Sequence, residues 1–305
     1  MPGRHVPVLR EEAVRLLVTD RGGVYVDVTL GMGGHASAIL RALDSGGRVI
    51  GLDCDPAAVA RAEAEPPAPA PRFLARRARF SQLAETLEDL GSGPVDGVLA
   101  DLGISSDQLD DPARGLAFSV DGPLDMRIDP SRPLGADAWI RQHDDRALLS
   151  VLERYGELPR ARAAVGAIRR AARVHDPLTT AALSAALEPL YPGPARPRRL
   201  AQAFQALRIA VNEEVEELTA LLATAPRLVR PGGTLCVISY HSLEDRLVKQ
   251  AIRPPRPVDP RAPIPESPWE PVTRRPIRAP ETECRQNPRA RSARLRAARR
   301  KDDRP

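Results

Sequence analysis

Four short segments of the chain carry residues whose types could hold and transform a ligand. They are Asp27-x-Thr29-x-Gly31-x-Gly33-Gly34, Asp53, Asp101 and Ser239-Tyr240-His241. Glycines let the backbone approach a ligand without obstruction by a Cβ atom. A carboxylate such as Asp53 can accept hydrogen bonds from both hydroxyls of a ribose. The glycine-rich segment and Asp53 together predict a site for a nucleoside-bearing cofactor.

Each of these segments lies at the end of a predicted strand. Apolar and β-branched runs predict strands over residues 24–28, 48–53, 72–75, 95–101 and 234–240. Helical patterns lie between the first of these strands, over residues 35–43, 55–65 and 80–90. This alternation predicts an α/β fold with a mostly parallel sheet and helices on both faces. Such sheets bind ligands beyond the carboxyl ends of their strands, near the point where the strand order reverses.

The alternation of strands and helices stops after Gly103. Residues 104–196 show helical patterns only, so we expect an all-helical insert there, between two parts of a core formed by residues 1–103 and 197–305. Beyond the last strong strand, Ser242 and Asp245 have the spacing of a capping box for a helix over residues 242–252. Residues 271–277 and 292–297 are predicted as two edge strands.

Composition limits the class of protein. The chain has 305 residues, of which 42% are hydrophobic and 28% charged, which excludes wholesale disorder, collagen and a membrane bundle. Its N-terminal segment carries Glu11 and Glu12 where a secretory signal needs an apolar stretch. Its three cysteines are far apart and lack CxxC spacing, which argues against disulfides and structural zinc. We therefore expect a cytoplasmic protein with no metal and no membrane partner.

Positive charge is concentrated at the C-terminal end. Residues 251–305 carry 15 Lys and Arg against 7 Asp and Glu, whereas residues 1–250 carry 30 against 33. Arginine-rich segments bind phosphates and release counterions, so a polyanionic partner and a solvated tail are both compatible with this distribution.

The glycine-rich segment alone leaves two cofactors open. Gly31-x-Gly33-x-x-Ala36 fits the dinucleotide fingerprint, and Asp53 follows Ala36 by 17 residues, close to the spacing of about 20 typical of that fingerprint. This alignment predicts an NAD(P)-dependent oxidoreductase. The same residues also align with the glycine-rich loop of methyltransferases, with Thr29 in place of its first glycine.

Longer segments resemble the MraW/RsmH family of ribosomal RNA cytosine-N4 methyltransferases, and they occur in family order along almost the whole chain. They comprise residues 5–9, 29–35, 101–110, 114–118, 121–130, 204–213, 239–246 and 287–292. Tyr240 replaces the usual phenylalanine, and the helices over residues 158–198 match only loosely.

The resemblance implies a Rossmann-like methyltransferase core with a helical insert. It also implies S-adenosylmethionine as methyl donor and a decoding-region cytosine of 16S rRNA in the small ribosomal subunit as acceptor. Carried over by motif, the cofactor contacts are Gly33, Gly34, His35, Asp53, Phe80, Asp101 and Gln108. Within this set we expect Phe80 to pack on the adenine and His35 to be a neutral donor.

A cytosine N4 is a poor nucleophile, so a hydrogen-bond acceptor on its N–H would help catalysis. Asp101 is the candidate for that role, with a contact to the cofactor as its alternative. For the pocket of the flipped cytosine we nominate Ser239, Tyr240 and His241, followed by Asn212 and Asp125.

The insert is expected to recognise RNA, and residues 289–300 are a further candidate contact. A non-catalytic ribosome-assembly factor is the other alternative, and the oligomeric state, including a homodimer, stays open.

Overall fold

The computed structural model describes residues 7–255 and 265–302, and its chain divides into two compact units. The sheet unit comprises residues 1–103 and 216–305, and the helical unit comprises residues 104–215. Our predicted insert ended at residue 196, which is too early. Helix α10 (Arg196–Asn212) belongs to the helical unit because its apolar side, including Phe204 and Leu207, packs in that unit's core.

The sheet unit is built on seven strands in the order β3-β2-β1-β4-β5-β7-β6. Their bounds are β1 Val24–Asp27, β2 Arg48–Asp53, β3 Phe73–Arg77, β4 Val95–Asp101, β5 Val229–Ser239, β6 Trp269–Pro271 and β7 Arg294–Arg300. Strands β1 to β5 are mutually parallel, and β7 pairs antiparallel with both β5 and β6. The mostly parallel α/β sheet predicted from the sequence is therefore confirmed. Its strand order reverses between β1 and β4.

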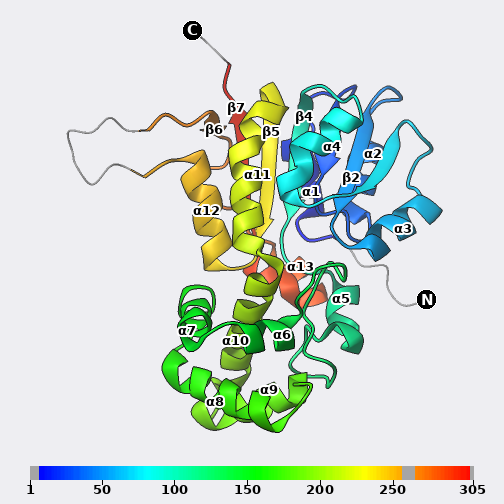
Figure 1. Cartoon of the computed structure of the whole chain (residues 1–305). Helices are drawn as coiled ribbons and strands as arrows, with labels where there is room; N and C mark the ends of the chain where they lie inside the picture. The colour runs from blue at the N-terminus through cyan, green and yellow to red at the C-terminus, as the bar shows by residue number, and fades with distance from the viewer. Residues whose placement is uncertain (1–6, 256–264, 303–305) are drawn as a thin grey trace. The chain divides into compact units, whose positions relative to one another are not determined.

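Helices cover both faces of this sheet because successive residues of each buried strand alternate between two apolar layers. Tyr25 and Val49 pack in one layer, and their neighbours Val26 and Ile50 pack in the other. The first layer includes α1 (Arg10–Leu17), α2 (Gly34–Ala42) and α3 (Pro56–Ala64). The second includes α4 (Leu83–Asp89), α11 (Glu214–Leu228) and α12 (Ser242–Ile252), which Figure 1 shows in front of the strands.

The C-terminal strand differs from its prediction. We expected an edge strand, but β7 lies inside the sheet between β5 and β6. Leu295, Ala297 and Ala298 are buried there. Small side chains suit this position because both faces of the strand are covered. Short helical segments, α13 (Glu281–Gln286) and a 3-10 turn (Pro288–Ser292), precede it.

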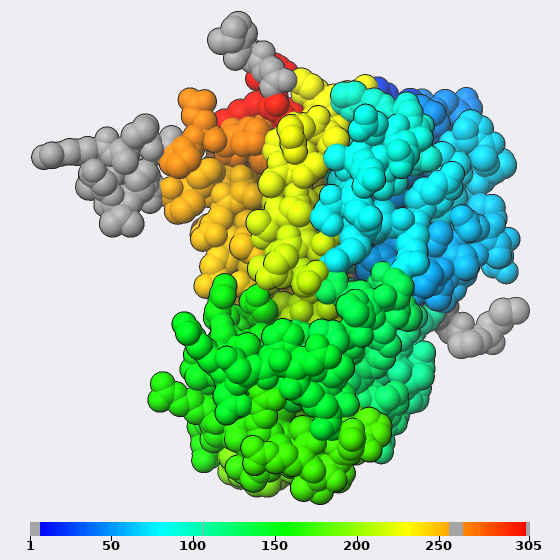
Figure 2. Space-filling view, in the orientation of Figure 1, coloured from blue at the N-terminus to red at the C-terminus, as the bar shows by residue number. Residues whose placement is uncertain are grey.

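The helical unit encloses a core of its own. Figure 2 shows the outer surface of this unit in green. Besides α10 it contains α5 (Ser106–Asp110), α6 (Ala136–Gln142), α7 (Asp145–Arg154), α8 (Ala161–Val174) and α9 (Thr180–Leu187). Asp144 starts a new helix as an N-cap, and Glu213 adopts a left-handed conformation (φ 55°) that ends α10.

Candidate functional site

The site lies in the sheet unit, at the carboxyl ends of β1, β2 and β4, where the strand order reverses. The turn after β1 is tied to its neighbours through Thr29. The Thr29 hydroxyl lies 3.3 Å from Asp27 Oδ1, and it accepts a hydrogen bond of 2.6 Å from the backbone N–H of Asp101. These bonds hold the end of β4 against the glycine-rich turn.

Asp53 joins this turn to the end of β2. Its Oδ2 accepts from the Gly31 N–H at 2.8 Å, and its Oδ1 accepts from the Asp55 N–H at 2.8 Å. A carboxylate has about four acceptor positions, so two remain for a ligand. Burial raises the pKa of Asp53 to about 6, against the opposing effect of these two hydrogen bonds. The acid and the glycine-rich turn are therefore close enough to contact one nucleoside.

The two adjacent glycines have different surroundings. Gly33 has φ 72°, and a Cβ atom placed there would meet no described atom within 4 Å. A Cβ at Gly34 would lie 2.3 Å from Cγ of Pro7. Gly33 thus borders open space that a ligand could use, whereas Gly34 is required by the N-terminal segment that packs on it.

His35 and Asp27 form the buried floor of the site. His35 is 4% exposed and Asp27 is fully buried. Nδ1 of His35 and Oδ2 of Asp27 have no hydrogen-bond partner among the described residues. Unsatisfied buried polar atoms of this kind point to a missing ligand or water, so these residues fit a bound polar group.

For His35, which we expected to be a neutral donor, burial and the neighbouring charges act on the pKa in opposite directions. Burial lowers its pKa, but the nearby Asp101 and Asp27 carboxylates outweigh burial, so the pKa is raised above its ordinary value. Nε2 of His35 lies 3.4 Å from Oδ2 of Asp101. The ring therefore retains its positive charge to a higher pH than a free histidine.

Asp101 stands between two side chains of the site. Tyr240 donates a hydrogen bond of 2.8 Å from its hydroxyl to Asp101 Oδ1, on the side of the carboxylate opposite His35. Burial and the Asp101 charge raise the pKa of Tyr240 well above its ordinary value, so it stays a donor. This contact uses a hydroxyl that a phenylalanine lacks, and it assigns Tyr240 a role in orienting Asp101.

The start of α12 fixes the other nominated residues of this segment. His241 is the N-cap of the helix, and Glu244 Oε2 accepts from the N–H groups of Tyr240 (2.9 Å) and His241 (3.3 Å). The predicted capping box of Ser242 and Asp245 is wrong, since the Asp245 carboxylate instead binds Arg296 of β7 at 2.7 Å. Ser239 is 2% exposed, and its hydroxyl lies 3.4 Å from the Arg294 carbonyl oxygen.

Phe80 follows β3 at the same edge of the sheet. Its approach is set by Ala78, whose N–H donates to the Asp53 carbonyl oxygen at 3.0 Å. The next residue, Ser81, is held by Glu217 through its N–H (2.9 Å) and its hydroxyl (3.0 Å). Phe80 itself is half-buried against the apolar layer that includes α4.

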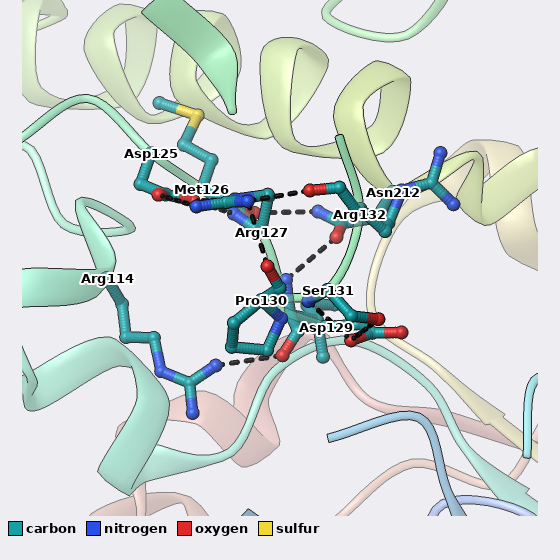
Figure 3. A network of polar contacts seen from close by, with 10 residues as sticks. Arg114, Asp125, Met126, Arg127, Asp129, Pro130, Ser131, Arg132 and Asn212 are labelled. Atoms are coloured by element: carbon teal, nitrogen blue, oxygen red, sulfur yellow. Dashed lines mark hydrogen bonds and ion pairs between the residues drawn. The ribbon is translucent and has the colours of Figure 1, made fainter. Parts of the chain in front are cut away.

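The remaining three nominated residues lie in the helical unit, where each supports local structure. Asn212 accepts from the Ile128 N–H (2.8 Å) and donates to the carbonyl oxygens of Met126 (2.8 Å) and Arg208 (2.9 Å). Figure 3 shows this side chain holding the loop that contains Asp125. Gln108 Oε1 accepts from the Ser105 N–H at 3.0 Å, in the capping box that starts α5.

The charge of the Asp125 carboxylate is paired with an arginine of the same loop. Arg127 donates to its two carboxylate oxygens at 2.8 and 2.7 Å, as Figure 3 shows. Burial raises the pKa of Asp125, but the Arg127 contacts outweigh burial and leave it below the ordinary value. Arg127 also donates to the carbonyl oxygens of Pro130 (2.9 Å) and Arg132 (2.6 Å). The pair therefore shapes the loop.

Sequence reasoning named Asp27 and Thr29 only as parts of the glycine-rich segment, without assigning either a contact, and it did not select Glu244. Asp27 and Thr29 were visible within the glycine-rich motif, and a buried acid at a strand end was an available signal. No signal in the sequence marked Glu244 as a site residue, because an acid in the first turn of a helix is ordinarily a capping residue.

Comparisons with known proteins find matches that extend over almost the whole chain. Residues 3–301 match the model of the MraW methylase family. A relative named ribosomal RNA small subunit methyltransferase H, from Sorangium cellulosum, is 46% identical over 97% of this chain and 91% of its own. A relative of the same name from Thermomicrobium roseum is 46% identical over 97% of this chain and 93% of its own.

Proposed function

The chain belongs to the MraW methylase family, and from that premise we propose that it transfers a methyl group from S-adenosylmethionine to the exocyclic N4 of a decoding-region cytosine in 16S rRNA. The observation that carries the proposal is the family match over residues 3–301, together with relatives named for small-subunit rRNA methylation. Within the described residues no helix has the length and apolarity needed to cross a membrane. A cytoplasmic location is part of the proposal.

S-adenosylmethionine supplies an activated methyl group on a sulfonium with a good leaving group. In our proposal the free acceptor positions of Asp53 take the ribose hydroxyls, and Phe80 packs beside the adenine. The open space at Gly33 and the unsatisfied Nδ1 of His35 belong to residues two positions apart at the start of α2. In-line positioning of donor and acceptor would supply most of the acceleration.

Asp101 is the proposed acceptor for the N4–H of cytosine. Its carboxylate is 21% exposed, so a base can reach it, and Tyr240 holds one oxygen in place. By accepting this hydrogen bond, the Asp101 carboxylate would increase the electron density on N4 during the attack. It would then receive the proton that N4 loses. The helical unit, which contains Asp125 and Asn212, is proposed to recognise RNA.

The test is mass spectrometry of nucleosides from small-subunit rRNA of cells with and without the gene. We expect N4-methylcytidine only when the gene is present. Purified protein should transfer labelled methyl groups to unmodified small subunits, and Asp53→Ala should abolish this transfer. Equal N4-methylcytidine in both strains would contradict the proposed reaction.

Two alternative functions can be tested with the same purified protein. An NAD(P)-dependent oxidoreductase should be protected against melting by NAD or NADP, whereas we expect protection by S-adenosylhomocysteine alone. A non-catalytic assembly factor should leave subunits unlabelled although it binds them. Sedimentation of the purified chain would measure whether it forms a homodimer.

A further inference from the structure

The helical unit is neutral overall, but its charges are segregated along the chain. Residues 104–215 carry 15 arginines and 15 acidic residues. The segment 158–200 holds 8 of these arginines and only 2 of the acids, Asp176 and Glu188. The rest of the unit is correspondingly acidic, with 7 arginines against 13 acids. The unit of zero net charge therefore contains a strongly basic segment, residues 158–200.

Helix α8 displays much of this positive charge. It has four arginines and no acidic residue, and its opposite side is buried among apolar residues of the unit's core. Arg162, Arg170 and Arg173 are exposed. Arg173 lies eleven positions beyond Arg162, a distance over which the helix rises about 16 Å. The three side chains thus form an exposed row, which we call the α8 arginine row.

The two acids of segment 158–200 and Asp145 of α7 are already paired. Asp145 binds Arg169 at 2.7 Å, and Asp176 and Glu188 lie 3.4 and 3.8 Å from Arg141 and Arg196. The adjacent helix α9 has no charged residue. Among the described residues, no ion pair or hydrogen bond involves the side chains of the α8 arginine row.

Arg169 shows what a structural arginine on this helix does. It binds Asp145 and the carbonyl oxygens of Ile140 and His143, and only 18% of its side chain is exposed. The arginines of the row make no such contacts. One of them, Arg170, lies over Gly166, where an added Cβ would be 3.3 Å from its Nη1. Gly166 leaves room for that guanidinium to lie along the helix toward Arg162.

We propose that the α8 arginine row binds consecutive phosphates of the rRNA backbone. This inference rests on the proposed function, which makes rRNA the substrate. Guanidinium groups bind phosphate oxygens bidentately and are weakly hydrated. Structured RNA presents phosphates and shape more than readable base edges, so a row of unpaired arginines is suited to orient the enzyme without reading sequence.

The test compares the full-length chain with two triple variants. The first, Arg162→Gln/Arg170→Gln/Arg173→Gln, removes the row. The control, Arg15→Gln/Arg41→Gln/Arg48→Gln, removes the same charge from exposed positions of the sheet unit. Binding to small ribosomal subunits and to protein-free 16S rRNA is measured at several salt concentrations. Melting curves and S-adenosylhomocysteine affinity should be unchanged in both variants.

We expect the row variant to lower the slope of log K against log salt by about two to three, because each phosphate contact contributes roughly 0.7–0.9. Its affinity at low salt should fall on the order of tenfold below that of the control. Equal slopes for the two variants would overturn the proposal. Loss of subunit binding with unchanged binding to protein-free rRNA would also overturn it, in favour of a protein partner.

If the proposed methylation of rRNA is wrong, the same experiments give a result that differs from a wrongly assigned arginine row. In that case wild-type protein leaves subunits unmethylated, whatever the binding of the two variants. If only the surface is misassigned, wild-type protein methylates subunits, and the row variant binds and methylates them as the control does.

Discussion

At the scale of single residues, Asp53 is the side chain whose ionisation should control cofactor binding. Its pKa is raised to about 6, and only the ionised carboxylate accepts from both ribose hydroxyls. We predict that affinity for S-adenosylhomocysteine is constant above this pH and falls toward about tenfold per pH unit below it. Calorimetric titrations between pH 5 and 8 measure this, and a flat profile would contradict it.

The same pKa has a consequence for the ligand-free protein. Because the folded-state value lies above the ordinary value of 3.8, the protonated acid favours folding, and the stability that it adds is lost as pH rises through about 6. Asp53→Asn should remove both pH dependences. Asp44→Asn is a matched control, since that acid is exposed and is not among the groups that shift the pKa of Asp53.

Gly33 and Gly34 should respond differently to an added methyl group. Gly33→Ala places it in open space, at a backbone cost of roughly 1–2 kcal/mol from the left-handed conformation. We expect its cofactor affinity to fall at least about tenfold, because the methyl group occupies the ligand's space. Gly34→Ala should instead lower the melting temperature through its collision with Pro7. Retained affinity in Gly33→Ala would contradict the placement of the ligand.

At the scale of elements, the start of α12 depends on Glu244, which is 5% exposed. Its carboxylate accepts from two backbone N–H groups and lies 2.9 Å from His241 Nε2. We predict that Glu244→Ala destabilises the protein by about 1–3 kcal/mol, since buried donors lose their acceptor. Glu244→Gln retains one acceptor oxygen and should restore part of this loss in urea unfolding curves. Equal stability of both variants and wild type would exclude the cap.

The last strand is a second element with a definite prediction. Because β7 pairs with β5 on one side and β6 on the other, a chain that stops at Arg291 loses the strand that joins β6 to the rest of the sheet. We expect no cooperative melting transition from it. A chain that stops at Asp302 keeps β7 and should melt like the full-length protein. Cooperative melting of the shorter chain would show that β7 is dispensable.

At the scale of the whole molecule, the helical unit is continuous in sequence and has its own core. Residues 104–215 expressed alone should therefore fold. Circular dichroism should show a cooperative helical transition, and an unfolded fragment would contradict this independence. The two segments of the sheet unit lie on either side of this insert in the chain, so each should require the other.

The sequence by itself determined the local elements of the sheet unit. Period-two and unbroken apolar runs predicted β1, β2 and β4 because buried strands need them, and Asp55-Pro56 predicted the start of α3 because the acid and the proline suit those positions. The glycine-rich turn and Asp53 were also visible, since few residue types allow a left-handed turn or hold a ribose.

Only the tertiary structure decided how distant segments combine. The Asp101–Tyr240 and Asp245–Arg296 contacts join residues 139 and 51 positions apart, and local pattern carries no information on such pairs. The position of β7 inside the sheet and of α10 within the helical unit has the same origin, because burial there is supplied by elements far along the chain. Whether a polar residue binds a ligand or, like Asn212 and Gln108, holds a loop or a cap depends on which backbone groups folding brings within its reach.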